Sequence, residues 1–169
     1  SDAKPPISIA VTGSAMCHTR SSSQPRWKTP LASYEGRKSI ESCVAAFRPG
    51  SATDPATTMG AIVSAAQLER VQGYIASAHK EGARLVYGGN RPSDPALQRG
   101  FFVEPTVFCD VTQSMRIARE EIFGPVLAIL PWSDEEDMLR QVNAVDYGLT
   151  CSIWTRDLDT ALRTAGNVQ

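Results

Sequence analysis

After about residue 35 this chain alternates between helix-like and strand-like segments, and this alternation limits the folds it can adopt. Apolar residues recur at helical spacing over residues 40–47 and 68–78. Short apolar or alternating runs favour strands at residues 84–87, 101–108, 126–130 and 149–155. Each of the last three runs is followed by a helical pattern. Strands that alternate with helices imply crossover connections. The sequence therefore predicts an α/β domain over residues 35–169, with three layers and a mainly parallel sheet.

The same patterns predict how the elements begin, end and pack. Ser64–Gln67 and Ser133–Glu136 each have the form of a capping box, and Asp157 is expected to cap the last helix. Gly82 is expected to end the helix that Ser64 begins. The last two predicted strands are expected to be neighbours near the centre of the sheet. The helix faces expected to pack inward are Leu68, Val71, Ile75 and Ala78, then Leu139, Val142 and Val145, then Leu158, Ala161, Leu162 and Ala165.

Residues 1–34 do not share this alternation and form a separate polar segment, which is predicted to be a loop or disordered. Within it, residues 18–30 contain two prolines, three consecutive serines and almost no apolar periodicity. Such a stretch buries too little apolar surface to offset the entropy lost on ordering, so residues 18–33 are predicted to be a loop or disordered. The charge of +3 on residues 18–30 is compatible with an anion-binding arm, but a solvated loop is the simpler interpretation.

Composition excludes several classes of function. Seventeen Lys and Arg against eighteen Asp and Glu give a net charge of −1, which lacks the basic excess of a nucleic-acid-binding protein. The longest apolar run, at residues 126–132, is far shorter than the roughly 18 residues that suggest a membrane span. The first six residues lack the features of a signal peptide. We therefore expect a cytoplasmic protein that binds neither nucleic acid nor membranes.

The four cysteines give no sign of a metal site. Cys17, Cys43, Cys109 and Cys151 form no C-x-x-C pair, and the two histidines lack ligand spacing. Free thiols fit a reducing compartment. Each cysteine taken alone is expected to be a small buried hydrophobic residue, and only Cys17 has a second interpretation.

One short segment is specific enough to indicate a family. Residues 119–126 have the sequence R-E-E-I-F-G-P-V, which resembles the E-E-I-F-G-P signature of the NAD(P)-dependent aldehyde dehydrogenase family. Further segments resemble motifs of that family in the family's order, at residues 54–60, 100–107, 143–149 and 153–157. This order disfavours an unrelated doubly wound domain that carries the motif by chance. The resemblance is nearest to the betaine and trimethylaminobutyraldehyde dehydrogenase branch, and it implies the family's catalytic domain, truncated at both ends.

The resemblance implies roles for three residues. Glu121 matches a glutamate that hydrogen-bonds the hydroxyls of the nicotinamide ribose, and Phe123 matches a phenylalanine that packs beside the nicotinamide. The implied cofactor is NAD or NADP. Cys17 lies 43 residues before Gly60, close to the spacing of the family's nucleophilic cysteine, although the glutamine of that motif is absent.

Other residues near these three are given structural or neutral roles. Glu120 is expected to be a surface residue. Gly124–Pro125 is expected to set the direction of the chain into the next strand. His18 is not expected to act as a general base, because its neighbourhood is loop-like and the family does not use a histidine there.

The implied reaction is oxidation of an aldehyde to a carboxylic acid. Attack by the cysteine gives a thiohemiacetal, hydride transfer to the cofactor gives a thioester, and water releases the acid. The family's coenzyme-binding domain and general-base motif have no counterpart in this sequence, so we expect a partial enzyme that is not competent as an isolated chain. The alternative is a catalytically dead relative that acts as a binding or interaction module. The expected partners are a small aldehyde substrate and further copies of the chain in a homo-oligomer.

Overall fold

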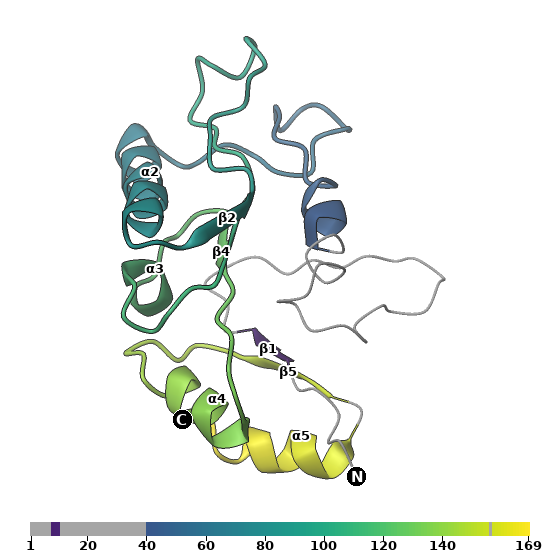
Figure 1. Cartoon of the computed structure of the whole chain (residues 1–169). Coiled ribbons are helices and arrows are strands. Elements are labelled where there is room, and N and C mark those ends of the chain that lie inside the picture. The colour runs from purple at the N-terminus through teal and green to yellow at the C-terminus, as the bar shows by residue number, and fades with distance from the viewer. Residues whose placement is uncertain (1–7, 11–39, 156) are drawn as a thin grey trace.

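The structure is a computed structural model of the 169-residue chain and describes residues 8–10, 40–155 and 157–169. Residues 40–44 are helical. The other elements are β1 (Ser8–Ala10), α2 (Ala65–Lys80), β2 (Arg84–Tyr87), β3 (Thr106–Cys109), α3 (Arg116–Arg119), β4 (Val126–Ala128), α4 (Glu135–Val142), β5 (Ser152–Trp154) and α5 (Leu158–Ala165). In Figure 1, α2 and α3 lie beside the sheet of β2, β3 and β4, and α4 and α5 lie near the β1–β5 pair. The predicted α/β class is confirmed, and no helix within the described ranges is long and apolar enough to cross a membrane.

Strand pairing is mixed in the described part of the chain. The parallel arrangement predicted for the sheet holds for β3 and β4, whereas β2–β3 and β1–β5 are antiparallel. The connections explain the difference. Residues 88–105 return from β2 to β3 without a helix, which permits an antiparallel pair. Residues 110–125 carry α3 across to β4, which is the crossover that a parallel pair requires.

The prediction that the last two strands are neighbours is wrong. Strand β4 belongs to the three-stranded sheet, whereas β5 pairs with β1 in a separate two-stranded sheet. The register places Ile9 opposite Ile153. β1 also lies in the segment for which the sequence predicts a loop. A three-residue strand whose partner is more than 140 residues away leaves no local periodicity that a sequence pattern could reveal.

Helix α2 forms one wall of the core. Ser64 caps its N-terminus, as predicted, by accepting a hydrogen bond from the Gln67 amide at 3.2 Å. Its C-terminus closes with Gly82 at φ +91° and a 2.9 Å bond from the Ala83 amide to the Ala78 carbonyl. The buried side chains of α2 are the four that the sequence predicts and one more, namely Leu68, Val71, Tyr74, Ile75 and Ala78. They pack against Val103, Phe108, Val111, Ile117 and Ile122.

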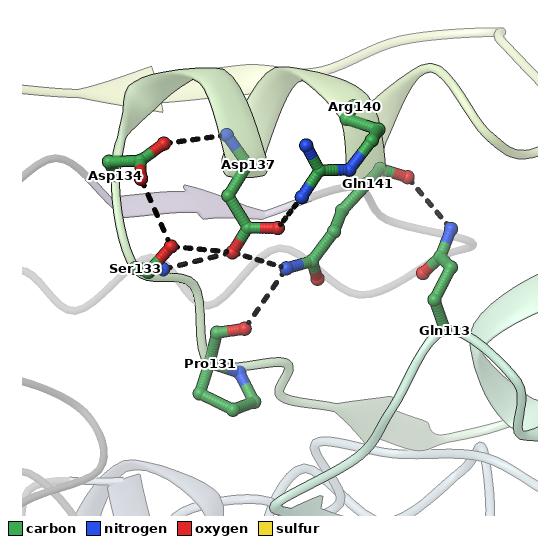
Figure 2. Close-up of polar contacts among 7 residues, drawn as sticks. All are labelled: Gln113, Pro131, Ser133, Asp134, Asp137, Arg140 and Gln141. Atoms are coloured by element: carbon green, nitrogen blue, oxygen red, sulfur yellow. Dashed lines mark hydrogen bonds and ion pairs between the residues drawn. The ribbon is translucent and has the colours of Figure 1, made fainter.

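Helix α4 begins one residue later than the capping box predicts. Asp134, not Ser133, is the N-cap, and its carboxylate accepts from the Asp137 amide at 2.9 Å. The Asp137 carboxylate accepts from the Ser133 amide at 2.9 Å and from Gln141 Nε2 at 3.1 Å (Figure 2). The Gln141 carbonyl accepts from Gln113 Nε2 at 2.8 Å, which ties α4 to the segment after β3. The start of α4 is therefore set by the carboxylates of Asp134 and Asp137, which are not part of the capping-box pattern.

The buried side of α4 also differs from the prediction. Met138 is 2% exposed, whereas Leu139, Val142 and Val145 are only partly buried. Apolar spacing alone does not distinguish the side of α4 that carries Met138 from the side that carries Leu139 and Val142. The two sides are adjacent on a helix of eight residues.

Helix α5 is capped by Asp157 as predicted, but it turns its threonine side inward instead of its leucine side. Thr164 is fully buried, whereas Leu158 and Leu162 are 70% and 64% exposed. The Thr164 hydroxyl donates to Glu135 of α4 at 3.2 Å. Arg163 pairs with the same carboxylate through two bonds of 2.9 and 2.8 Å. Polar contacts between the two helices therefore set the orientation of α5, and the predicted inward face of this helix is wrong.

We expect the N-terminus of α4 to loosen in acid. Hydrogen bonds from the Ser133 amide and from Gln141 hold the pKa of the Asp137 carboxyl below its ordinary value of 3.8. A lowered pKa stabilises the folded state above pH 3.8, and this contribution is lost as the pH falls through the lowered value. Asp137→Asn should remove that part of the acid dependence of thermal unfolding. Asp146→Asn, at an exposed position, is the control, and an unchanged pH dependence in Asp137→Asn would contradict the prediction.

Candidate functional site

The segment Glu120–Pro125 connects α3 to β4 and lies against α2. Gln67, in the first turn of α2, donates Nε2 to the Ile122 carbonyl at 2.8 Å and to the Phe123 carbonyl at 3.1 Å. The Ile122 side chain is part of the hydrophobic core. The Gln67 side chain thus does not return to its own N-cap as a complete capping box would. It holds the backbone of the segment that carries the candidate site residues.

Gly124 is the point at which this segment comes closest to α2. A Cβ atom at Gly124 would lie 2.5 Å from Cγ2 of Val71, which is fully buried. A side chain at that separation would force the Val71 side chain, the helix or the segment to shift. The next carbonyl, that of Pro125, accepts from the Thr106 amide at 2.8 Å and leads the chain into β4. These contacts agree with the structural role predicted for Gly124–Pro125.

Glu120 is exposed, as expected of a surface residue, but its carboxylate is firmly held. It accepts from the Tyr74 hydroxyl at 2.8 Å and from Arg116 Nε at 2.9 and 3.0 Å. The Arg116 guanidinium, together with the Tyr74 hydroxyl, keeps the pKa of the Glu120 carboxyl below its usual value. The same guanidinium lies over the Tyr74 ring, 4.4 Å from its centroid.

Glu121 and Phe123 are the two large side chains of the segment that take no part in the contacts with α2 and α3 described above. Glu121 is partly buried, and within the described part of the chain its carboxylate makes no hydrogen bond or ion pair. Phe123 is 62% exposed and has φ +52°, in the left-handed region that a bulky residue rarely adopts. Such a conformation costs about 1–3 kcal/mol and persists only where surrounding contacts enforce it. The structure thus presents a carboxylate and an aromatic ring, two residues apart, on one fixed turn.

Three of the four cysteines lie in the described part of the chain. Cys17 and the loop predicted at residues 18–33 lie outside the described residues. Cys109 is buried, as the simple interpretation of a cysteine predicts, and Cys43 and Cys151 are partly buried. Among the residues that the structure describes, no cluster of three or more His, Cys, Asp or Glu side chains could hold a metal ion.

Two hollows on the described surface lie elsewhere than the Glu120–Pro125 segment. The first, of about 340 Å³, lies where Phe47 and Pro49 face the Tyr87–Gly88 end of β2. The second, of about 270 Å³, lies between α2 and the loop around Arg99–Phe101. Neither hollow includes Glu121 or Phe123, and both are wide open. We therefore take the Glu121 carboxylate and the Phe123 ring, rather than either hollow, as the candidate site.

Three supporting residues were not predicted from the sequence. Gln67 was interpreted as half of a capping box, and Tyr74 was not included in the buried face of its helix. Arg116 received no role. Their partners lie 55, 46 and 4 residues away along the chain. The one available signal was the i, i+4 spacing of Arg116 and Glu120, which favours an ion pair on a helix.

Comparison with known proteins identifies the family. Residues 35–169 match the aldehyde dehydrogenase family. This chain belongs to that family. Aldehyde dehydrogenase tropH of Talaromyces stipitatus is 58% identical over 126 residues, which are 73% of this chain and 24% of the relative. A betaine aldehyde dehydrogenase of Mesorhizobium japonicum is 48% identical over 123 residues, or 73% of this chain and 25% of the relative.

Solved aldehyde dehydrogenases share the fold of the described domain. The Mycobacterium tuberculosis enzyme complexed with NAD+ has a TM-score of 0.75 and 46% identity, over 79% of this chain and 27% of that one. The NAD+ complex of the Bacillus cereus enzyme has a TM-score of 0.71 and 36% identity, over 80% and 28%. This chain therefore spans about a quarter of the length of its aldehyde dehydrogenase relatives.

The close approach of Gly124 to α2 predicts a steric penalty for any side chain there. Gly124→Ala should lower the free energy of unfolding by about 1–3 kcal/mol, because the added methyl group overpacks the contact with Val71. Gly73→Ala is the matched control, since a Cβ at Gly73 meets nothing within 4 Å. In the middle of a helix that change should raise stability by about 0.5–1 kcal/mol. Urea unfolding measures both, and equal effects of the two variants would contradict the packing argument.

Proposed function

We propose that this chain is the catalytic-domain part of an aldehyde dehydrogenase that oxidises an aldehyde to a carboxylic acid with NAD or NADP. The observation that carries the proposal is the fixed turn of Glu120–Pro125. Its backbone and the Glu120 side chain are held by the protein, while the Glu121 carboxylate and the Phe123 ring are left for a ligand. Similarity to enzymes whose structures contain NAD+ supports a nicotinamide coenzyme as that ligand.

Each of the two side chains suits one part of a nicotinamide nucleoside. The Glu121 carboxylate can accept hydrogen bonds from two vicinal ribose hydroxyls, and such charge-assisted bonds are the stronger kind. The Phe123 ring, turned outward by its left-handed backbone, can cover the nicotinamide face and exclude water from the site of hydride transfer. When bound, the coenzyme supplies a hydride acceptor.

We propose Cys17 as the nucleophile on the basis of its spacing from Gly60. Its thiolate would attack the aldehyde carbon to form a thiohemiacetal. Loss of hydride to the coenzyme would give a thioester, and water would release the carboxylic acid and the thiol. A cytoplasmic location suits this chemistry, because a reducing compartment keeps thiols free.

A second candidate function is that of a catalytically dead relative that serves as an interaction module. It is favoured by large apolar side chains exposed on the C-terminal part of the chain. They include Leu149 at 95%, Trp154 at 64%, Leu158 at 70% and Leu162 at 64%. Exposed apolar surface of this kind marks sites of protein association. We also propose that copies of the chain associate through this surface.

The proposed coenzyme contact predicts a specific effect of removing one charge. Glu121→Gln should weaken NAD+ binding on the order of tenfold, since a hydrogen bond to a charged group is worth about 1.5–3 kcal/mol. Saturation-transfer NMR at millimolar NAD+ detects even weak binding. Glu136→Gln, an exposed position on α4, is the control. Equal binding by Glu121→Gln and the parent chain, or no binding by the parent, would count against the site.

The isolated chain should not turn over any aldehyde. Oxidation needs a thiolate, a base that activates water, and a nicotinamide held close to the substrate. Loss of the positioning of nicotinamide and substrate is enough to raise the activation barrier of the reaction by about 7 kcal/mol, or roughly five powers of ten in rate. The measurement is NAD(P)H formation at 340 nm with a panel of aldehydes. Turnover that Cys17→Ala abolishes would overturn the expected lack of competence and assign the nucleophile, whereas turnover unaffected by Cys17→Ala would remove Cys17 from the mechanism.

The proposed self-association predicts a change in molecular mass on polar substitution. The parent chain should form dimers or larger species in multi-angle light scattering. Leu158→Gln combined with Leu162→Gln should shift it toward monomer, because both side chains lie on the exposed side of α5. Ala76→Gln, at an exposed position on α2 and outside this surface, controls for added polarity. A monomeric parent chain at high concentration would contradict the proposal.

A further inference from the structure

We infer that Tyr74 is a positioning residue for the coenzyme-binding turn: by holding Glu120 it fixes the backbone from which Glu121 projects. The inference rests on the proposed function, because it assigns Tyr74 a role through Glu121. Tyr74 lies in the middle of α2, is completely buried, and was not predicted to face the core. Its hydroxyl donates to Glu120 Oε2 at 2.8 Å.

Arg116 completes this contact. Its Nε donates to both oxygens of the Glu120 carboxylate, at 2.9 and 3.0 Å, while its guanidinium carbon lies 4.4 Å from the centroid of the Tyr74 ring. Arg70, one turn before Tyr74 on α2, donates to the Tyr74 hydroxyl at 3.3 Å. The Glu120 carboxylate is thus held on one side by a buried hydroxyl and on another by a cation that itself rests on the tyrosine ring. We call these three residues, Tyr74, Arg116 and Glu120, the clasp.

The short helix that supplies Arg116 is itself tied to α2. Helix α3 has four residues and no side-chain cap at its N-terminus. The Arg116 amide donates instead to Glu81 Oε2, at the end of α2, at 2.7 Å. A four-residue helix has little stability of its own. The position of Arg116, and with it the clasp, therefore depends on contacts made by α2.

The clasp and Gln67 act on opposite sides of Glu121. Glu120 is held through its side chain, and the carbonyls of Ile122 and Phe123 are held by Gln67. Gln67 and Tyr74 are seven residues apart, so they lie on the same face of α2. One helix face thus fixes the chain immediately before and immediately after Glu121. This arrangement sets the direction of the one carboxylate in the segment that has no partner in the described structure.

A simple packing role for Tyr74 makes a different prediction. If only the ring matters, Tyr74→Phe should leave the turn unchanged, because phenylalanine fills nearly the same volume. If the hydroxyl positions the turn, Tyr74→Phe should leave the Glu120 carboxylate held by Arg116 alone and increase the backbone motion of Glu120 and Glu121. Tyr87→Phe on β2 is the matched control, since the Tyr87 hydroxyl makes no hydrogen bond in the described residues.

The test combines hydrogen exchange with NAD+ binding on the full 169-residue chain. In Tyr74→Phe the Glu120 amide, which donates to the Arg116 carbonyl at 3.1 Å, should exchange about tenfold faster, the effect of losing one hydrogen bond to a charged group. NAD+ affinity should fall about fivefold, less than in Glu121→Gln, because Tyr74 affects binding only through the position of Glu121. It should fall no further when Tyr74→Phe is added to Glu121→Gln, because the effect acts through Glu121. Tyr87→Phe should change neither readout.

The outcomes separate the inference from the proposed function. Unchanged exchange of the Glu120 amide in Tyr74→Phe overturns the inference. So does faster exchange with unchanged NAD+ affinity, provided that Glu121→Gln still weakens binding. If Glu121→Gln has no effect on binding, the proposed function fails and Tyr74 loses its role toward coenzyme. Should Tyr74→Phe fail to fold, Glu120→Gln tests the same clasp from its exposed end, and unchanged exchange there overturns the inference equally.

Discussion

The contact between Val71 and Gly124 fixes how near the E-E-I-F-G-P segment lies to α2, and the other contacts of the candidate site depend on that distance. With 2.5 Å between Val71 Cγ2 and the position of a Cβ at Gly124, the segment lies directly on the helix. At this separation the side-chain amide of Gln67 reaches two backbone carbonyls. The glycine of the motif is therefore explained by packing, independently of any ligand.

Strain and anchoring are combined in the same turn. Phe123 has a left-handed backbone that costs about 1–3 kcal/mol, and its ring gains little from burial because it is 62% exposed. The bonds from Gln67 to the carbonyls of Ile122 and Phe123, together with the buried Ile122 side chain, offset that cost. The conformation makes physical sense if the exposed ring has a ligand to cover.

What the sequence predicted well was local. The limits of α2, its Ser64 cap and the Gly82 stop depend on neighbouring residues, and so does the strand at residues 84–87. The roles of Glu121 and Phe123 stay predictions, and they too rest on a local signal, a short motif of adjacent residues. What it missed was set by contacts between distant residues, such as the pairing of β1 with β5 and the hydroxyl of Tyr74 reaching Glu120 across 46 positions. The same holds for α5, whose threonine face is turned inward by Glu135 of another helix.

The distribution of buried side chains shows which part of the fold supports the site. Nearly all the buried apolar residues of the described chain lie between Leu68 and Ile122, and after residue 128 only Met138, Thr160 and Thr164 are buried. Regions with few buried contacts open locally at low cost. The part after β4 should therefore open more readily than the core between Leu68 and Ile122. The turn that carries Glu121 is attached to α2 and the core through Gln67 and Ile122, so its geometry does not require α4 or α5 to stay docked.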